Sequence, residues 1–147
     1  MPRLALGVSY NGLQYQGWQS QPSGLTVQDR LESALSRFAD LKVSTLCAGR
    51  TDAGVHGLMQ VVHFDTDIER PEHAWVRGTN ACLPADIAVH WARTVPKSFH
   101  CRGSALSRRY SYLVLDSSVR PSLDRGRVGW AYSRLSRSEE HTSELQS

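Results

Sequence analysis

The chain opens with a strand-like alternation of apolar and polar positions and then changes to a helical spacing. Apolar side chains occupy every second position from Leu4 to Tyr10, which predicts a half-buried strand. Thr26 follows a polar loop and suits the N-cap of a helix, because its hydroxyl can accept hydrogen bonds from free backbone N–H groups. The apolar face of that helix is predicted to consist of Val27, Leu31, Ala34, Leu35 and Phe38.

The loop between these two elements opens with Asn11 and Gly12. We expect a turn at these two residues, because both tolerate a positive φ. Two further apolar runs, residues 42–47 and 59–64, are predicted strands on either side of a glycine-rich loop at residues 48–57.

A second helix and a further strand follow in the same way. Pro71 suits the first position of a helix, and Pro84 is expected to stop it. Ile87, Val89 and Trp91 then alternate with other residues, as in a strand. One face of the helix is predicted to consist of Ala74, Trp75, Gly78, Ala81 and Cys82, with Trp75 in the core.

The order of these elements predicts the fold class. Residues 1–96 read β-α-β-β-α-β, which is typical of an α+β fold, the ferredoxin-like sandwich. Residues 97–136 are expected to begin a second domain with a strand at 108–115. Because nothing later supplies a second layer, we expect this strand to be unpaired and the second half to be incomplete in a truncated chain.

The last segment of the chain differs in composition from the rest. Residues 137–147 are polar and acidic with one Leu, whereas the preceding sequence is basic and strongly patterned. These residues also resemble the in-frame translation of a sequencing-library adaptor, so we predict a non-native tail. Resequencing should show a reading frame that continues past about Ser136, whereas a genomic stop codon after Ser147 would contradict this.

Composition narrows the class of protein only moderately. The 147 residues are 40% hydrophobic and 21% charged, which is enough apolar material for a core. The net charge of +3 fits a polyanionic partner but equally fits a solvated basic surface. No apolar run is long enough for a membrane helix or a signal peptide, so we expect a cytoplasmic protein without membrane contact. The odd, widely spaced cysteines Cys47, Cys82 and Cys101 predict buried or half-buried thiols, without a disulfide framework and without a metal site.

The residue types that carry chemistry gather in the loop at residues 48–57. It reads AGRTDAGVHG and combines three glycines with Arg50, Asp52 and His56. Glycine permits close backbone approach, so such a loop can hold a side chain against a ligand. The Asp52 carboxylate suits a nucleophile or a general base, although it could merely cap a turn, with Arg50 as a surface ion-pair partner.

Four segments in order resemble the TruA family of bacterial tRNA pseudouridine synthases, over about residues 3–130. The loop carries the family pattern Gly-Arg-Thr-Asp-x-Gly-Val-His, in which the aspartate is catalytic. The other three segments run from Tyr10 to Gln19, with Asn11 in place of the usual Asp, from Asn80 to Val89, and from Phe99 to Tyr112.

The resemblance implies a role for each candidate residue. Asp52 is expected to be the catalytic residue, and Tyr110, Arg50, His56 and Arg109 are expected to bind substrate. Tyr110 would stack on the flipped uracil, unless it is a strand-face core residue. Arg50 would fill the space that the base vacates or hold a phosphate, and Arg109 belongs to a basic cluster suited to phosphates. His56 is better suited to orienting the loop than to transferring protons.

The implied reaction is the isomerisation of uridine to pseudouridine at positions 38–40 of the tRNA anticodon stem-loop, without a cofactor or metal. Uracil is detached from C1′ of the ribose, rotated and rejoined through C5. The target base must first be flipped out, at a cost of a few kcal/mol. The resemblance does not say whether Asp52 attacks the base or the sugar or removes a ribose proton. Family members are homodimers.

One departure affects the expected activity. The family's later half supplies an active-site arginine that pairs with the catalytic carboxylate, and the sequence after Trp130 contains no counterpart. We therefore predict that this polypeptide as written is inactive, poorly soluble, or both.

Two other functions are compatible with the same element order. A non-catalytic RNA-binding module shares the β-α-β-β-α-β layout, although the aromatic signature of the common RNA-recognition domains is not found here. A structural or protein-interaction domain is the second alternative, and it would show no salt-sensitive tRNA binding. Tyr15 and Trp18 either stack on RNA or anchor their own loop.

Overall fold

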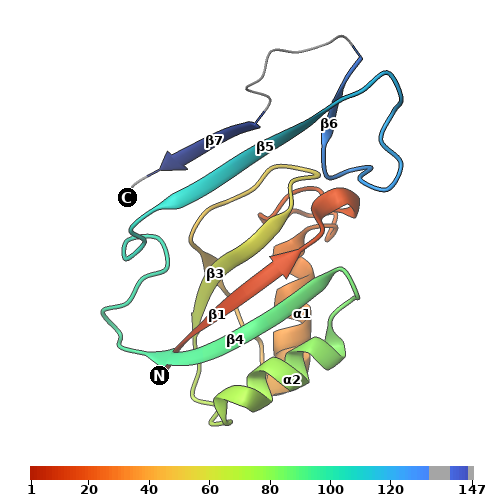
Figure 1. Ribbon diagram of the computed structural model, residues 1–147. Helices are drawn as coiled ribbons and strands as arrows, with labels where there is room; N and C mark the ends of the chain where they lie inside the picture. Colours follow the sequence, from red (N-terminus) through yellow and green to blue (C-terminus); the bar gives the residue numbers. More distant parts are fainter. Residues whose placement is uncertain (133–139, 146–147) are drawn as a thin grey trace. The chain divides into compact units, whose positions relative to one another are not determined.

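The computed structural model of the protein describes residues 1–132 and 140–145. The chain divides into two compact units, Met1–Ala105 and Leu106–Ser147 (Figure 1). The first unit therefore continues past residue 96, where the sequence suggested a boundary.

The first unit has the predicted β-α-β-β-α-β order. Its sheet runs β2-β3-β1-β4, every neighbouring pair is antiparallel, and both helices cover one face of it (Figure 1). The ferredoxin-like α+β sandwich predicted from the sequence is therefore confirmed. The elements are β1 (Arg3–Tyr10), the short 3₁₀ helix η1 (Gly12–Gln14), α1 (Val27–Ala39), β2 (Leu46–Cys47), β3 (Gly57–Asp65), α2 (Glu72–Cys82) and β4 (Ile87–Val95).

The core lies between the sheet and the two helices. Thr26 caps α1 as predicted, since its side chain accepts a hydrogen bond from the Asp29 backbone N–H at 3.1 Å. The predicted stripe of α1 faces the sheet, with Phe38 only half-buried and in edge contact with Trp75 at 5.1 Å between ring centroids. Trp75 also meets Phe64 of β3 at 5.3 Å, so this tryptophan is a core residue, as predicted.

The buried face of α2 agrees with the prediction at Trp75 and departs from it at Ala81 and Thr79. Trp75 and Thr79 are its fully buried side chains, one turn apart, whereas Ala81 is exposed. Residues four apart lie on one side of a helix, and the large indole sets which side faces the core. A small residue such as Ala81 tolerates both buried and exposed positions, so its place in the sequence does not determine which side of the helix faces the core.

The strand predicted at residues 42–47 is shorter than expected, because only Leu46–Cys47 pairs with β3. The preceding residues bond to side chains of α1 instead. The Val43 N–H donates to Ser36 Oγ at 2.9 Å, and the Thr45 N–H donates to Glu32 Oε2 at 2.7 Å. The helix side chains thus take the backbone groups that a longer strand would have offered to β3.

The alternation predicted for β4 is broken once. Val89 pairs with Val8 and Trp91 pairs with Gly7, so the register between β4 and β1 shifts by one residue. Ile87 and Val89 consequently face the core, whereas Trp91 is half-buried. A bulge of this kind reverses the face on which the following side chains lie.

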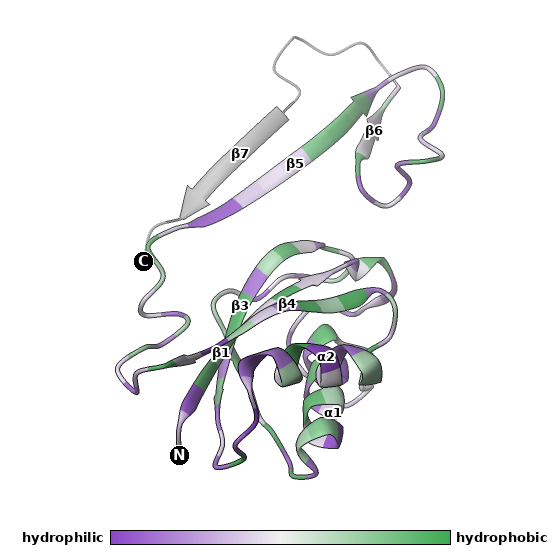
Figure 2. Cartoon of the chain, turned by 60° about the horizontal axis from the view of Figure 1, so that its bottom comes forward, coloured by the Kyte–Doolittle hydropathy of each residue, from purple (hydrophilic) through white to green (hydrophobic). Residues whose placement is uncertain are grey.

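The second unit is a small sheet of β6 (Gly129–Ala131), β5 (Arg108–Asp116) and β7 (Glu140–Leu145), in that order. The prediction that strand 108–115 is unpaired is therefore wrong. β6 pairs with it in parallel and β7 in antiparallel orientation. The backbone N–H and C=O groups along the edges of a single strand are available for pairing with other segments of the chain. Most β5 side chains remain exposed, including Tyr112 at 72%, and its apolar residues lie toward its end (Figure 2).

Two further points concern the chain ends and the helices. β7 lies within residues 137–147, and the non-native origin of that segment stays a prediction. Within residues 1–132 and 140–145, neither α-helix has the length and apolar character needed to cross a membrane.

Candidate active site

Residues 48–56 connect β2 to β3 and are called the Asp52 loop below. Arg50 and Asp52 are both exposed, two residues apart, near the middle of the loop. The loop has no regular secondary structure of its own, so its shape depends on the residues that bond to it. Three groups of contacts supply that support.

The start of the loop is fixed from β3. The Ala48 N–H donates to the Val61 carbonyl at 2.8 Å. One residue later, the buried side chain of Gln60 bonds to both backbone groups of Gly49: its Oε1 accepts from the Gly49 N–H at 3.3 Å, and its Nε2 donates to the Gly49 carbonyl.

The middle of the loop is fixed by the segment that follows β1. The hydroxyls of Tyr10 and Thr51 are 2.8 Å apart and hydrogen-bonded. The Thr51 carbonyl, next to Asp52, accepts from the Trp18 N–H at 3.0 Å. Gly17 has a φ of +87°, and a Cβ at this position would lie 2.8 Å from the Thr51 carbonyl oxygen. Gly17 therefore meets two requirements, a left-handed backbone and close approach to the loop.

The end of the loop is fixed by η1. The Gly12 N–H donates to His56 Nδ1 at 2.9 Å, and a Cβ on Gly12 would lie 1.9 Å from the Val55 carbonyl oxygen. This explains Gly12 better than the predicted turn with positive φ. Asn11 has a φ of −87° and caps η1 by accepting from the Leu13 N–H at 3.1 Å.

Residues 80–89, another of the four segments that resemble the family, bond to the residues that follow β1. The Tyr15 hydroxyl donates to Asp86 Oδ1 at 2.6 Å, and the Asn11 N–H donates to the Asp86 carbonyl at 2.9 Å. Burial and the Asp86 carboxylate raise the pKa of Tyr15, so its hydroxyl stays protonated as a donor. Asn80 bonds to both backbone groups of Val89, at 2.9 and 2.8 Å.

The aromatic residues of the loop after β1 serve as anchors in the structure. Trp18 is 1% exposed and packs against Tyr10 at 5.5 Å between ring centroids. Tyr15 is half-buried and holds Asp86, as described above. Of the two roles considered for Tyr15 and Trp18, the geometry supports the anchoring one.

The predicted site residues fall into two groups. Arg50, Asp52 and His56 lie together in one loop of the first unit. Tyr110 and Arg109 lie on β5 in the second unit, and both are exposed. Sequence reasoning overlooked Gln60 and Thr51, whose roles depend on contacts across the fold, although a glutamine inside an apolar strand is a detectable signal.

The last of the four family-like segments, from Phe99 to Tyr112, begins within the first unit. Arg3 of β1 donates to the carbonyls of Lys97 and Phe99 at 3.0 and 2.6 Å and forms an ion pair with Asp65 at 2.9 Å. The Arg3 guanidinium lowers the pKa of the Asp65 carboxyl to about 2. The Cys101 N–H donates to Nδ1 of the buried His63 at 3.2 Å. These bonds attach residues 97–104 to the sheet and account for the extension of the first unit to Ala105.

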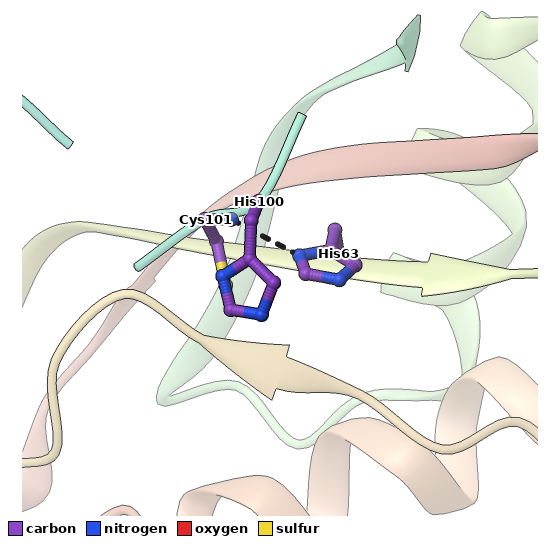
Figure 3. A group of neighbouring side chains, drawn as sticks. All are labelled: His63, His100 and Cys101. Carbon is purple, nitrogen blue, oxygen red and sulfur yellow. Dashed lines mark hydrogen bonds between the residues drawn. The ribbon is translucent and has the colours of Figure 1, made fainter. Parts of the chain in front are cut away.

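His63, His100 and Cys101 form a cluster in which one ring nitrogen of each histidine and the sulfur of the cysteine lie within 4.8 Å of one another (Figure 3). Nδ1 of His63 accepts from the Cys101 N–H, and Nδ1 of His100 accepts from the Arg102 N–H at 3.1 Å. A neutral imidazole has one lone-pair nitrogen, so Nε2 carries the proton in both rings. The thiol of Cys101 donates to the Leu46 carbonyl at 3.3 Å. The cluster therefore serves to attach the segment, and a metal would have to displace these bonds.

Cys47 and Cys101 are buried and Cys82 is half-buried, as predicted for the three thiols. Burial raises the pKa of Cys47 and of Cys101, which keeps both as neutral thiols. Neither has the depressed pKa of a nucleophilic cysteine.

The site is thus an exposed carboxylate and an exposed guanidinium on a loop that is bonded at its start, middle and end. Such a loop can present the carboxylate to a polyanionic substrate as a nucleophile or base, because its backbone position is set before the substrate arrives. The fold and the site define an α+β domain of ferredoxin-like layout that presents an exposed carboxylate and an exposed guanidinium on the loop between β2 and β3.

Comparison with known proteins gives the family. A sequence model described as tRNA pseudouridine synthase matches residues 7–102, and the chain belongs to that family. The tRNA pseudouridine synthase A of Albidiferax ferrireducens is 71% identical over 133 residues, which are 90% of this chain and 51% of that protein. The corresponding proteins of Polaromonas sp. and Acidovorax ebreus are 71% and 66% identical and are covered to 50% and 51%. The resemblance stated from four segments is confirmed, and the chain spans about half the length of these relatives.

Proposed function

We propose that this chain carries the catalytic half-site of a tRNA pseudouridine synthase, with Asp52 as the reacting carboxylate. The observation that carries the proposal is the exposed Asp52 on a loop held by the segments at residues 10–18 and at residue 60. Membership of the family and the name of the relatives support the same reaction. The substrate is a uridine at positions 38–40 of the tRNA anticodon stem-loop.

Each site residue has a role in this reaction. Asp52 attacks the base or the sugar, or removes a ribose proton, while uracil leaves C1′ and returns through C5. Arg50, also exposed, occupies the space of the flipped base or binds a phosphate. Tyr110 stacks on the uracil, and Arg109 contacts the RNA backbone. His56 accepts the Gly12 N–H, so it orients the loop.

The proposal extends to partners and location. The partner is tRNA, the complete enzyme is a homodimer that uses no cofactor or metal, and it acts in the cytoplasm. The 147-residue chain alone is expected to be inactive, because it spans about half the length of the relatives named as this enzyme.

The test compares two proteins. One is the 147-residue chain, and the other is a chimera in which the matched 133 residues replace those of the Albidiferax ferrireducens relative. We expect pseudouridine formation on an anticodon stem-loop transcript by the chimera and none by the chain alone. Asp52→Ala and Asp52→Asn in the chimera should reduce the rate at least about 10²-fold while tRNA binding is retained.

Three results would contradict the proposal or part of it. Full activity of the Asp52→Ala chimera would remove the carboxylate from the mechanism. Salt-sensitive tRNA binding by a chimera that never forms pseudouridine would favour the non-catalytic RNA-binding module. Turnover by the 147-residue chain at the rate of the full-length relative would refute the inactivity of the chain.

A further inference from the structure

Gln60 is a buried polar side chain to which the proposed reaction assigns no role. It is 9% exposed, and its neighbours along β3 on both sides are apolar. Buried amides need hydrogen-bond partners, and this amide directs both of its groups to a single residue, Gly49. Gly49 precedes Arg50 in the Asp52 loop.

The Gln60 side chain continues the ladder between β2 and β3 past the point where the backbones separate. The last paired residues are Cys47 and Val62, and the Ala48 N–H still reaches the Val61 carbonyl at 2.8 Å. At Gly49 the backbone of β3 no longer supplies a partner, and the amide of Gln60 takes that place. The direction in which the chain enters the loop is thus set by a side chain.

A bulge in β3 lies between Gln60, which bonds to the start of the loop, and Gly57, which follows the end of the loop. Val8 pairs with Gln60 and Tyr10 pairs with Gly57, so β3 has one more residue than β1 between these pairs. Leu58, within the bulge, is 91% exposed. The bulge thus lies between Gln60 and the end of the Asp52 loop, and it interrupts the regular alternation of side chains along the strand. Bulges are common beside active sites, where they change the direction of a side chain.

We propose that Gln60 is a positioning residue for the reaction of Asp52, acting through the backbone of Gly49. This inference rests on the proposed function, because Gln60 is proposed to position the carboxylate that reacts. Arg50 and Asp52 have exposed side chains, so the bonded backbone on either side of them is what determines where they project. Loss of the amide releases Gly49, while the Ala48 N–H keeps its bond to Val61. Tyr10, Trp18 and Gly12 continue to hold the middle and end of the loop.

Two substitutions separate this role from general stability. Gln60→Met keeps the length of the side chain and removes both hydrogen bonds. Gln60→Glu keeps an acceptor for the Gly49 N–H but loses the donor to the Gly49 carbonyl. The matched control is Gln28→Met, because the amide of Gln28 bonds to Ser20, Glu32 and Thr45, all outside the loop.

The first measurement is amide hydrogen exchange of Gly49 in the isotope-labelled 147-residue chain. We expect faster exchange at Gly49 in Gln60→Met and an unchanged rate in Gln28→Met. Unchanged exchange at Gly49 in Gln60→Met would overturn the contact itself, and this measurement does not depend on enzymatic activity.

The second measurement is single-turnover pseudouridine formation by the chimera, together with the Kd for tRNA, well below the melting temperature of every variant. We expect a loss of about 10²-fold in rate for Gln60→Met, a smaller loss for Gln60→Glu, and a Kd within about twofold of the parent. An unchanged rate in either Gln60 variant with faster exchange at Gly49 would overturn the positioning role. If Gln60→Met does not fold, Gln60→Glu decides. An inactive unsubstituted chimera would refute the proposed function instead, while the exchange result would still report on the contact.

Discussion

Gly12 and Gly17 bring two backbone segments closer together than any side chain would permit. At Gly17 the positive φ adds a second requirement, whereas at Gly12 the approach to Val55 is sufficient. Both contacts press the segment after β1 against the Asp52 loop. Their removal should therefore affect the loop before it affects the distant core.

Gly12→Ala should destabilise the protein. The added Cβ would lie 1.9 Å from the Val55 carbonyl oxygen, so one of the two backbone segments must move. Such overpacking costs about 1–3 kcal/mol, measured as the free energy of unfolding in urea. Gly103→Ala is the matched control, because its Cβ would meet only His100 at 3.8 Å, and we expect a change within about 0.5 kcal/mol. Equal stability of the two variants would show that the contact at Gly12 is looser than the structure indicates.

The sequence predicted single residues well where the signal is local. Thr26 was identified as an N-cap, and the pattern around Asp52 placed a loop between two strands. The interpretation of Asn11 and Gly12 was wrong about the cause, because the steric reason for Gly12 lies in Val55, far along the chain. Gln60 could not be assigned for the same reason, since its partner becomes its neighbour only after folding.

Segment 97–104 shows how an irregular element is attached by a few polar contacts. Arg3 holds two of its carbonyls, and the buried His63 accepts the Cys101 N–H. Burial lowers the pKa of His63, the neighbouring Arg3 and His100 side chains lower it further, and the carboxylate of Asp65 opposes them. The contact requires neutral His63, because a proton on Nδ1 would face the Cys101 N–H.

This attachment should weaken at mildly acidic pH. Because the folded pKa of His63 is lowered, the unfolded state binds more protons, so the stabilisation is complete above about pH 6.5 and is lost as the pH falls through the folded pKa. Asp65, with a pKa of about 2, stays ionised in this window. The urea midpoint at about pH 5 and pH 8 should differ more for the parent than for His63→Asn, which keeps an acceptor that does not titrate. Equal pH dependence of the two proteins would contradict the assignment.

At the same scale, the sequence predicted the kinds and order of the elements better than their edges. Each predicted helix and strand of the first unit is present, but the strand at 42–47 contracts to Leu46–Cys47. Ser36 and Glu32 on α1 take the backbone groups of residues 43 and 45, and no local pattern announces this competition. The alternation that included Trp91 failed because a bulge in the pairing of β4 with β1 is a property of two strands, not of one.

The two units differ in how completely they bury apolar residues. The first has a continuous core between its sheet and helices. The second exposes large apolar side chains on β5 and in the segment that follows it, including Tyr112 at 72%, Leu123 at 92% and Tyr132 at 73%. Exposed apolar groups in such number favour association. This agrees with the expectation from the sequence that the 147-residue chain is poorly soluble, which stays a prediction.

Residues 1–105 should therefore fold as a separate polypeptide and stay monomeric at concentrations where the 147-residue chain associates. The fragment retains the core and the attachment of segment 97–104, so we expect cooperative unfolding in urea and unchanged amide chemical shifts through β4. Sedimentation should give a monomer for the fragment, and Tyr112→Thr with Tyr132→Thr in the full chain should reduce association. Leu41→Thr is the control, because this residue is 54% exposed on the first unit and should leave association unchanged. An unfolded fragment would show that the first unit depends on the second for its stability. A fragment that associates as strongly as the full chain would show that the exposed apolar groups of the second unit are not the cause of association.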